Sequence, residues 1–191
     1  MFGGSLFIFR CEEDVGGENM NVLEAIKKRR SVRRFLKDDV PEDTMMELLE
    51  AMRWAPSAGN LQPWEFVVVR DAGVKGRVAE AARQDWIAEA PVVVVVCASP
   101  DRSSPRYGDR GINLYCLQDT AAAVQNLHLA AVEKGLGTCW VGAFDESGIA
   151  QAIGAPKNIR PVAVVPVGRP AETPAPRPRR SLEEVVHRDR F

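Results

Sequence analysis

The chain has 191 residues, of which 46% are hydrophobic and 27% are charged, and its formal net charge at pH 7 is -1. This length and apolar content are sufficient for one domain with a buried core. Because positive and negative charges nearly balance, neither nucleic acid nor a charged membrane surface is expected as a partner.

The reactive side chains form no evident metal or disulfide framework. The four cysteines include no C-x-x-C pair, and the two histidines have no metal-site spacing. The sequence therefore predicts a cytoplasmic protein with reduced thiols and no metal.

The first residues, 1–19, are predicted to be an appendage of unknown role. They begin with a glycine-rich apolar stretch that is too short to span a membrane, without a basic region or a small-residue cleavage site before it. An appendage, an alternative start and an extra edge strand all fit this composition.

A helix that starts at Val22 is predicted to run into a basic stretch, RRSVRRF, from Arg29 to Phe35. Arginine presents a planar fork of donors that matches carboxylate or phosphate oxygens, and Ser31 adds a hydroxyl donor. The stretch therefore suits one compact dianion. Lys27 and Lys28 are instead interpreted as solvated cations that complement the dipole at the end of the helix.

A second helix is predicted from about Pro41 to Ala55, ending before Pro56. Its apolar residues recur at helical spacing and indicate one buried face: Met45, Leu48, Leu49 and Met52. The segment 56–63 follows as a loop rich in turn-forming residues, and 65–70 is predicted to be a strand. A loop between a buried helix and a buried strand is a suitable place for functional residues.

The middle of the chain is expected to contain a helix over 74–86 and a strand over 92–98. The strand is apolar without alternation, so it should be central and covered on both faces. The polar, glycine- and proline-rich segment 99–113 is expected to be a loop carrying Arg106, Tyr107 and Arg110. It is interpreted as either a solvated connection or a substrate lid.

The segment 114–134 predicts a long alanine-rich helix that ends at Gly135. His128 on this helix is expected at the surface or in a packed position, not as a ligand. Strands are predicted over 138–144 and 161–167, with a short helix between them that begins at Asp145 and ends at Gly154. The residues of the long helix expected to face the core are Leu117, Ala121, Val124, Leu127 and Ala131.

The C-terminal residues 171–191 are predicted to form an extended arm. Closely spaced prolines prevent a normal helix from 170 to 178. Ser181 and Glu184 have the spacing of a capping box, which predicts a last short helix. The arginines of the arm have no explanation from local sequence.

Three further motifs follow the basic stretch in the chain: PSAGNLQPW at 56–64, GTCWVGAF at 137–144 and GRP at 168–170. Together with the basic stretch, they resemble the nitroreductase family of FMN-dependent oxidoreductases. The resemblance covers 20–170 and implies a nitroreductase-like α+β fold, in which a mixed, mainly antiparallel sheet is flanked by helices. It also implies an intertwined homodimer with the long helix at its centre and the C-terminal arm around the partner subunit.

The resemblance further implies which residues bind FMN. Phosphate, ribityl and pyrimidine atoms would be held by Arg29, Arg30, Ser31 and Arg33, with Arg169 approaching the phosphate. The backbone N–H groups of Val141 and Gly142 would face flavin N5 and O4, and many relatives have an acidic residue where Val141 stands. The flavin of the other subunit would be reached by Pro56, Ser57, Ala58 and Asn60.

The expected activity is hydride transfer from NADH or NADPH to a small acceptor, such as a nitroaromatic or a quinone, by a ping-pong mechanism. No dinucleotide-binding fingerprint follows a strand, so the nicotinamide cofactor would bind transiently over the flavin. No catalytic side chain is expected, because the flavin carries the chemistry. The alternatives are a reductive dehalogenase or flavin-destroying enzyme of the same fold, and a non-catalytic FMN-binding protein.

Overall fold

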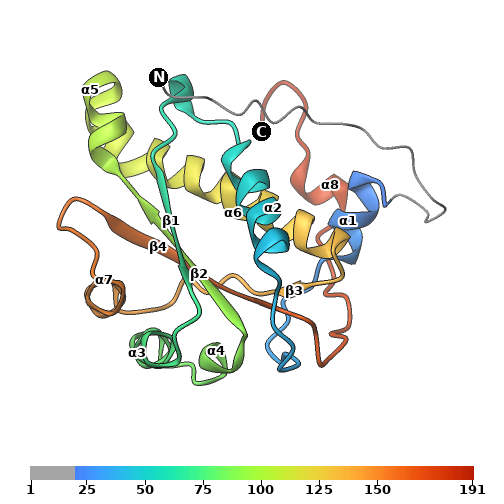
Figure 1. Ribbon diagram of the computed structural model, residues 1–191. Coiled ribbons are helices and arrows are strands. Elements are labelled where there is room, and N and C mark those ends of the chain that lie inside the picture. Colours follow the sequence, from blue (N-terminus) through green and yellow to red (C-terminus); the bar gives the residue numbers. More distant parts are fainter. Residues whose placement is uncertain (1–19) are drawn as a thin grey trace, which may run out of the picture.

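The structure is a computed structural model, and it describes residues 20–191 (Figure 1). The predicted appendage 1–19 and Cys11 lie outside the described residues. The strands are β1 (Trp64–Val69), β2 (Val92–Ala98), β3 (Gly137–Thr138) and β4 (Arg160–Gly168). The α-helices are α1 (Val22–Lys28), α2 (Glu42–Arg53), α3 (Ala72–Ala82), α4 (Trp86–Glu89), α5 (Pro100–Arg110), α6 (Cys116–Glu133), α7 (Glu146–Ile153) and α8 (Leu182–Val185). Two short turns of other helix types are η1 (Ala58–Asn60) and η2 (Gly111–Tyr115).

The four strands form one antiparallel sheet in the order β1-β2-β4-β3. Every residue of β2 is buried, because this strand lies inside the sheet and helices cover both of its faces. Val92, Val94 and Val96 pack with α2 and α6, whereas Val93 and Val95 pack with α3, α4 and α7. Figure 1 shows these two helical layers on opposite sides of the sheet. The predicted central, doubly covered strand is confirmed.

The core-facing residues of α6 differ in part from the prediction. Val124, Leu127 and Ala131 are buried, but Leu117 and Ala121 are only partly buried. The buried face instead includes polar side chains whose hydrogen bonds are made inside the protein, such as Thr120, which donates to the Cys116 carbonyl at 2.9 Å. A prediction from hydrophobicity alone therefore misses the hydrogen-bonded polar residues on the buried face of α6.

The sequence predicts a loop over 99–113, and the structure corrects this to the helix α5, which is interrupted at Gly108, followed by the π-helical turn η2. Pro100 stands in the first turn, where its missing N–H is not needed. Gly111 of η2 packs on Ser103, and a Cβ atom on this glycine would lie 2.6 Å from the Ser103 carbonyl oxygen. The turn-forming composition thus belongs to a tightly packed helical unit.

Two further boundaries differ from the predictions. The helix expected over 74–86 divides into α3 and α4, because Arg83 adopts a left-handed conformation with φ of 52°. The strand expected over 138–144 is limited to β3, although Val141 still forms a bridge to Val164.

The predicted caps of the later helices are confirmed. The Asp145 carboxylate accepts a hydrogen bond from the Ser147 N–H at the start of α7, and Gly154 ends that helix in a left-handed conformation. Ser181 and Glu184 form both bonds of the capping box of α8. Between the end of β4 and the start of α8, residues 172–181 form no helix or strand.

Candidate functional site

The basic stretch lies along the β3 edge of the sheet. The Val32 N–H donates to the Thr138 carbonyl at 2.9 Å, and Ser31 forms a parallel bridge to the same residue. Further along, the Leu36 N–H donates to the Arg169 carbonyl at 2.9 Å. Phe35 also forms an isolated antiparallel bridge to Pro170. These contacts place the basic stretch beside two motifs that are distant in sequence.

A cavity of about 480 Å³ lies between the basic stretch and the C-terminal arm. Its volume is in the range of small-molecule sites. The lining residues are basic, small or apolar, and none is acidic: Ile26, Lys27, Arg29, Arg30, Ser31, Arg33, Pro174, Ala175, Pro176, Arg177 and Arg179. Such a set of guanidinium and ammonium donors fits an anion.

Local hydrogen bonds hold the basic residues at this cavity. Arg30 Nη1 donates to the Lys27 carbonyl at 2.6 Å and to the Arg29 carbonyl at 2.9 Å, at the end of α1. The backbone N–H of Arg33 donates to Glu172 Oε1 at 2.7 Å, which ties the start of the arm to the basic stretch. The predicted residues 29–31 and 33 therefore come together in one place.

The structure also changes the set of basic residues assigned to the site. Arg177 and Arg179 line the cavity although local sequence gave them no role, and their position in a proline-rich arm was the available signal. Lys27 also borders it, but this lysine is exposed and lies in the last turn of α1, as its interpretation as a solvated cation predicts, whereas Lys28 is absent from the lining. Arg169 is exposed and outside the lining, and it contributes its carbonyl to Leu36.

Val141 and Gly142 lie on the strand-like segment after β3. The Val141 N–H donates to the Val164 carbonyl at 2.9 Å, so it is already paired within the chain, and its contact with the flavin stays a prediction. Among the described residues, no acceptor pairs with the Gly142 N–H. Gly142 also borders a second cavity, of about 300 Å³, beside Trp140 and Phe144. Of the two predicted backbone donors, Gly142 is thus the one whose N–H is unpaired among residues 20–191, and both assignments stay predictions.

The segment 56–60 adopts an unusual backbone conformation that internal contacts maintain. Gly59, Asn60 and Gln62 all have positive φ, at 57°, 56° and 51°. Such conformations cost about 1–3 kcal/mol at a residue with a side chain, and they persist only where surrounding contacts impose them. Here Ser57 Oγ accepts from the Gln62 N–H at 3.0 Å.

Asp119 of α6 anchors the same segment through a contact that no local sequence pattern predicts. Its Oδ1 accepts from the Ala58 N–H at 3.1 Å. Its Oδ2 is buried and has no hydrogen-bond partner among the described residues. Burial raises the pKa of the Asp119 carboxyl group, against the smaller lowering effect of the Ala58 bond.

His128, further along α6, stands behind the basic stretch. It is buried, and its Nδ1 lies 2.6 Å from Thr138 Oγ1. Burial, with a smaller contribution from the Arg29 charge, lowers the pKa of His128 to about 4, so the ring is neutral at pH 7. Its predicted role as a packed residue, one of the two alternatives, is confirmed.

The two predicted groups of site residues contact opposite halves of α6. The segment 56–60 meets it at Asp119, and the basic stretch meets it near His128 through Thr138. These two helix positions are separated by about 13 Å at a rise of about 1.5 Å per residue. Within one chain, the basic cavity therefore contains no residue of 56–60.

The described cysteines offer no activated thiol. Cys97, Cys116 and Cys139 are free and buried, and burial raises the pKa of each, that of Cys97 to about 12. No group of three or more histidine, cysteine or acidic side chains among residues 20–191 could hold a metal ion. No helix in the same range is long and apolar enough to cross a membrane.

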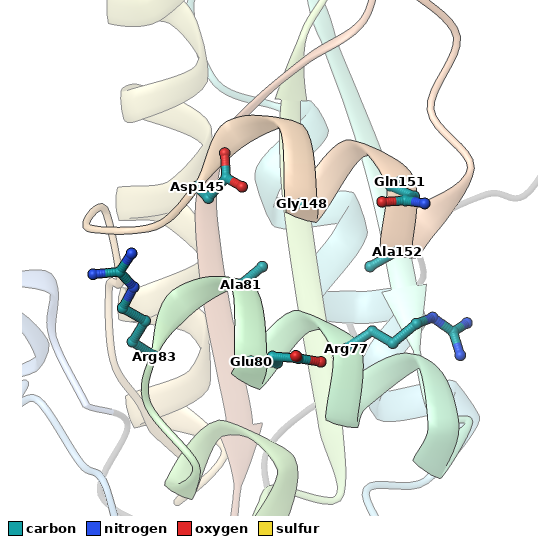
Figure 2. A pocket seen from close by; sticks show the side chains of 8 residues that line it. All are labelled: Arg77, Glu80, Ala81, Arg83, Asp145, Gly148, Gln151 and Ala152. Carbon is teal, nitrogen blue, oxygen red and sulfur yellow. The ribbon is translucent and has the colours of Figure 1, made fainter.

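A larger cavity, of about 810 Å³, lies between α3 and α7 (Figure 2). Figure 2 shows Arg83 and Asp145 at one end of it and Arg77 and Gln151 at the other. The cavity mixes charges of both signs, and the Asp145 carboxylate is already engaged in capping α7. None of the predicted cofactor-binding residues lines it.

An antiparallel sheet between two helical layers, with a basic cavity at the β3 edge, defines an α+β protein. The chain matches the nitroreductase family over residues 26–86 and 73–169, and it belongs to that family.

Known relatives agree with this assignment. The chain is 36% identical over 163 residues to a provisionally named NADH dehydrogenase/NAD(P)H nitroreductase from Methanothermobacter thermautotrophicus, covering 83% of this chain and 82% of the relative. It is 34% identical to an NADH dehydrogenase from Thermus thermophilus, covering 87% and 95% of the two chains. The structure of the NADPH:FMN oxidoreductase of Vibrio harveyi in complex with NAD+ is similar, with a TM-score of 0.81, 25% identity, and coverage of 89% and 77%.

Proposed function

We propose that the chain is an FMN-dependent oxidoreductase that accepts hydride from NADH or NADPH and reduces a small acceptor by a ping-pong mechanism. The observation that carries this proposal is the basic cavity between the start and the end of the domain. FMN has a phosphate dianion, and the cavity supplies arginine side chains from two segments and no acidic side chain. Membership of the nitroreductase family and the names of the relatives support a nicotinamide nucleotide as the hydride donor.

The chain's own residues bind and orient the cofactor in this proposal. The phosphate, ribityl and pyrimidine atoms are held by Arg29, Arg30, Ser31 and Arg33, with Arg177 and Arg179 closing the phosphate end and Arg169 near the end of β4. The Gly142 N–H meets a polar edge of the ring system. When bound, FMN supplies the hydride chemistry, so no side chain is required as an acid or a base.

The proposed enzyme is a homodimer in which Pro56, Ser57, Ala58 and Asn60 contact the flavin held by the other subunit. Two observations support this arrangement. The basic cavity and the segment 56–60 are separated along α6 in one chain. Large apolar side chains are also exposed on α1 and after α2, among them Leu23 at 66% and Trp54 at 71%. An interface with a second copy would cover such surfaces.

The test is the absorbance spectrum of the purified protein before and after anaerobic addition of NADH and of NADPH. A flavin spectrum that bleaches within the mixing time is expected, followed by recovery on addition of a nitroaromatic or a quinone. Rapid oxidation by halogenated phenols alone would favour the dehalogenase alternative. A stable flavin spectrum that neither nucleotide bleaches would contradict the proposal and indicate a non-catalytic FMN-binding protein.

A further inference from the structure

The helix α5 lies directly on the segment 56–61. Arg102 Nε donates to the Leu61 carbonyl at 3.0 Å. A Cβ atom on Gly59 would lie 2.8 Å from Arg106 Nη1 and 2.8 Å from Tyr107 Oη. A guanidinium group and a phenol of α5 therefore cover the left-handed turn of this segment, and glycine at 59 is what permits their approach.

These side chains belong to a cluster of cations and aromatic rings. The guanidinium carbon of Arg106 lies 5.4 Å from the centre of the Tyr107 ring, and that of Arg110 lies 5.2 Å from the centre of the Tyr115 ring. The two tyrosine rings meet edge to face, with centres 5.1 Å apart. Arg110 Nε also donates to Tyr115 Oη at 3.1 Å.

The cluster has positive charge that internal partners do not neutralise. Among residues 20–191, neither Arg106 nor Arg110 forms an ion pair with an acidic side chain. Both are exposed, while Tyr107 and Tyr115 are partly buried. The helix α5 is interrupted at Gly108, which has a φ of 52°, and the edge-to-face contact of Tyr107 with Tyr115 joins the side chains on the two sides of this interruption. Gly111 of η2 also lies close to the Ser103 carbonyl of α5.

We propose that Arg106, Arg110, Tyr107 and Tyr115 form a subsite for the anionic group of a substrate that reaches the flavin, namely a carboxylate or a phosphate on a molecule with a planar ring. This inference rests on the proposed function, in which the segment 56–60 contacts the flavin of the other subunit. The arginines bind the anion, and the tyrosines pack against the ring. The cluster is distinct from the FMN phosphate site, which lies toward the opposite end of α6.

Binding of an unreactive ligand tests the subsite without catalysis. Benzoate and benzamide share one ring and differ in charge, and calorimetric titration of the oxidised protein compares their affinities. We expect benzoate to bind about tenfold more tightly than benzamide, as one charge-assisted hydrogen bond would give. Arg106→Gln and Arg110→Gln should each remove most of this preference.

Arg77→Gln is the matched control, because Arg77 is an exposed arginine at the cavity between α3 and α7, away from the cluster (Figure 2). It removes the same charge and should leave the preference for benzoate unchanged. Circular dichroism establishes that each variant is folded. The substitution Tyr107→Phe removes only a hydroxyl group from the same subsite and keeps the ring. Equal affinities for benzoate and benzamide in the wild-type protein would overturn the proposal.

Steady-state kinetics then identify the source of the anion. If Arg106→Gln raises the KM for 4-nitrobenzoate but not for 4-nitrobenzamide, the subsite serves a charged acceptor. If it raises the KM for NADPH more than that for NADH, the subsite binds the nucleotide's additional phosphate. KM values that stay unchanged for all four substrates would overturn the proposal. Wild-type protein whose flavin neither nucleotide reduces would instead contradict the proposed function, and the benzoate titration would still test the subsite.

Discussion

At the scale of single residues, Arg33 and Lys28 have the same charge within the same basic stretch but different surroundings. Arg33 lines the basic cavity, and Lys28 does not. We predict that Arg33→Ala raises the FMN dissociation constant by about one to two decades, the effect of losing a charge-assisted hydrogen bond. Lys28→Ala should change it by less than about fivefold, because a solvated cation at a helix end contributes at most about 1 kcal/mol.

Flavin fluorescence titration at fixed salt measures both constants. The pair controls for the overall field, because each substitution removes one positive charge. Saturating FMN should restore much of the NADH-dependent rate of Arg33→Ala, since this arginine positions the cofactor and exchanges no proton. Equal losses of affinity in the two variants would contradict a specific site.

His128 gives a second prediction, on pH dependence. Its pKa is lowered from 6.5 to about 4 by burial, so the unfolded chain binds a proton more readily than the folded one between these values. The free energy of unfolding should therefore fall as the pH drops from about 6.5 to about 4, by up to about 3 kcal/mol. Above about pH 7 this contribution to stability is fully present.

Urea denaturation of the wild type and of His128→Gln at several pH values measures the effect. Glutamine has a neutral amide that is able to bond with Thr138, but it does not titrate. The difference between the two stability curves should change across this pH window, while other titrating groups cancel. Parallel curves would show that His128 is not the group responsible.

At the scale of elements, truncation of the C-terminal arm tests whether its arginines contribute to FMN binding. The two arginines at the cavity precede α8, so they and the helix are removable separately. Removal of 174–191 takes Arg177 and Arg179 away from the cavity, whereas removal of 181–191 takes α8 and the residues after it, none of which lines the cavity. We predict that the longer deletion weakens FMN binding by at least about tenfold, whereas the shorter one has a small effect. Both deletions leave Glu172 and its bond to the Arg33 N–H in place.

Flavin titration of the two truncated proteins, with circular dichroism as a check of folding, makes this comparison. The arm contains no buried residue beyond Pro170, so neither deletion should disturb the core. Similar losses from both deletions would show that the arm acts through α8 or through general packing rather than through its arginines.

At the scale of the whole molecule, the shared-site proposal predicts a dimer with one FMN per chain. Dilution that dissociates the dimer should release the flavin, because each site would lose the segment 56–60 of the other subunit. Sedimentation velocity recorded at the flavin absorbance follows both quantities together. A stable monomer that keeps full flavin occupancy would show that each chain binds FMN alone.

Some features of this molecule are determined by local sequence. The uninterrupted apolar run of β2 predicts a strand buried on both faces, and Asp145, Gly154 and Ser181 predict helix ends that the structure confirms. The spacing of Met45, Leu48 and Met52 likewise predicts the buried face of α2. Each of these signals depends on residues within a few positions of one another, where backbone geometry alone places the side chains.

Only the tertiary structure decided the composition of the candidate site and the form of α5. The bond between the Arg33 N–H and Glu172 joins positions 139 residues apart, and no local pattern predicts that Arg177 and Arg179 return to the basic stretch. The Val141 N–H is paired because β4 lies beside it. The helix α5 and the turn η2, where the composition favours a loop, pack together at Gly111 and Ser103. Such contacts are selected by the packing of the complete chain, and they form together with the core because their partners are distant in sequence.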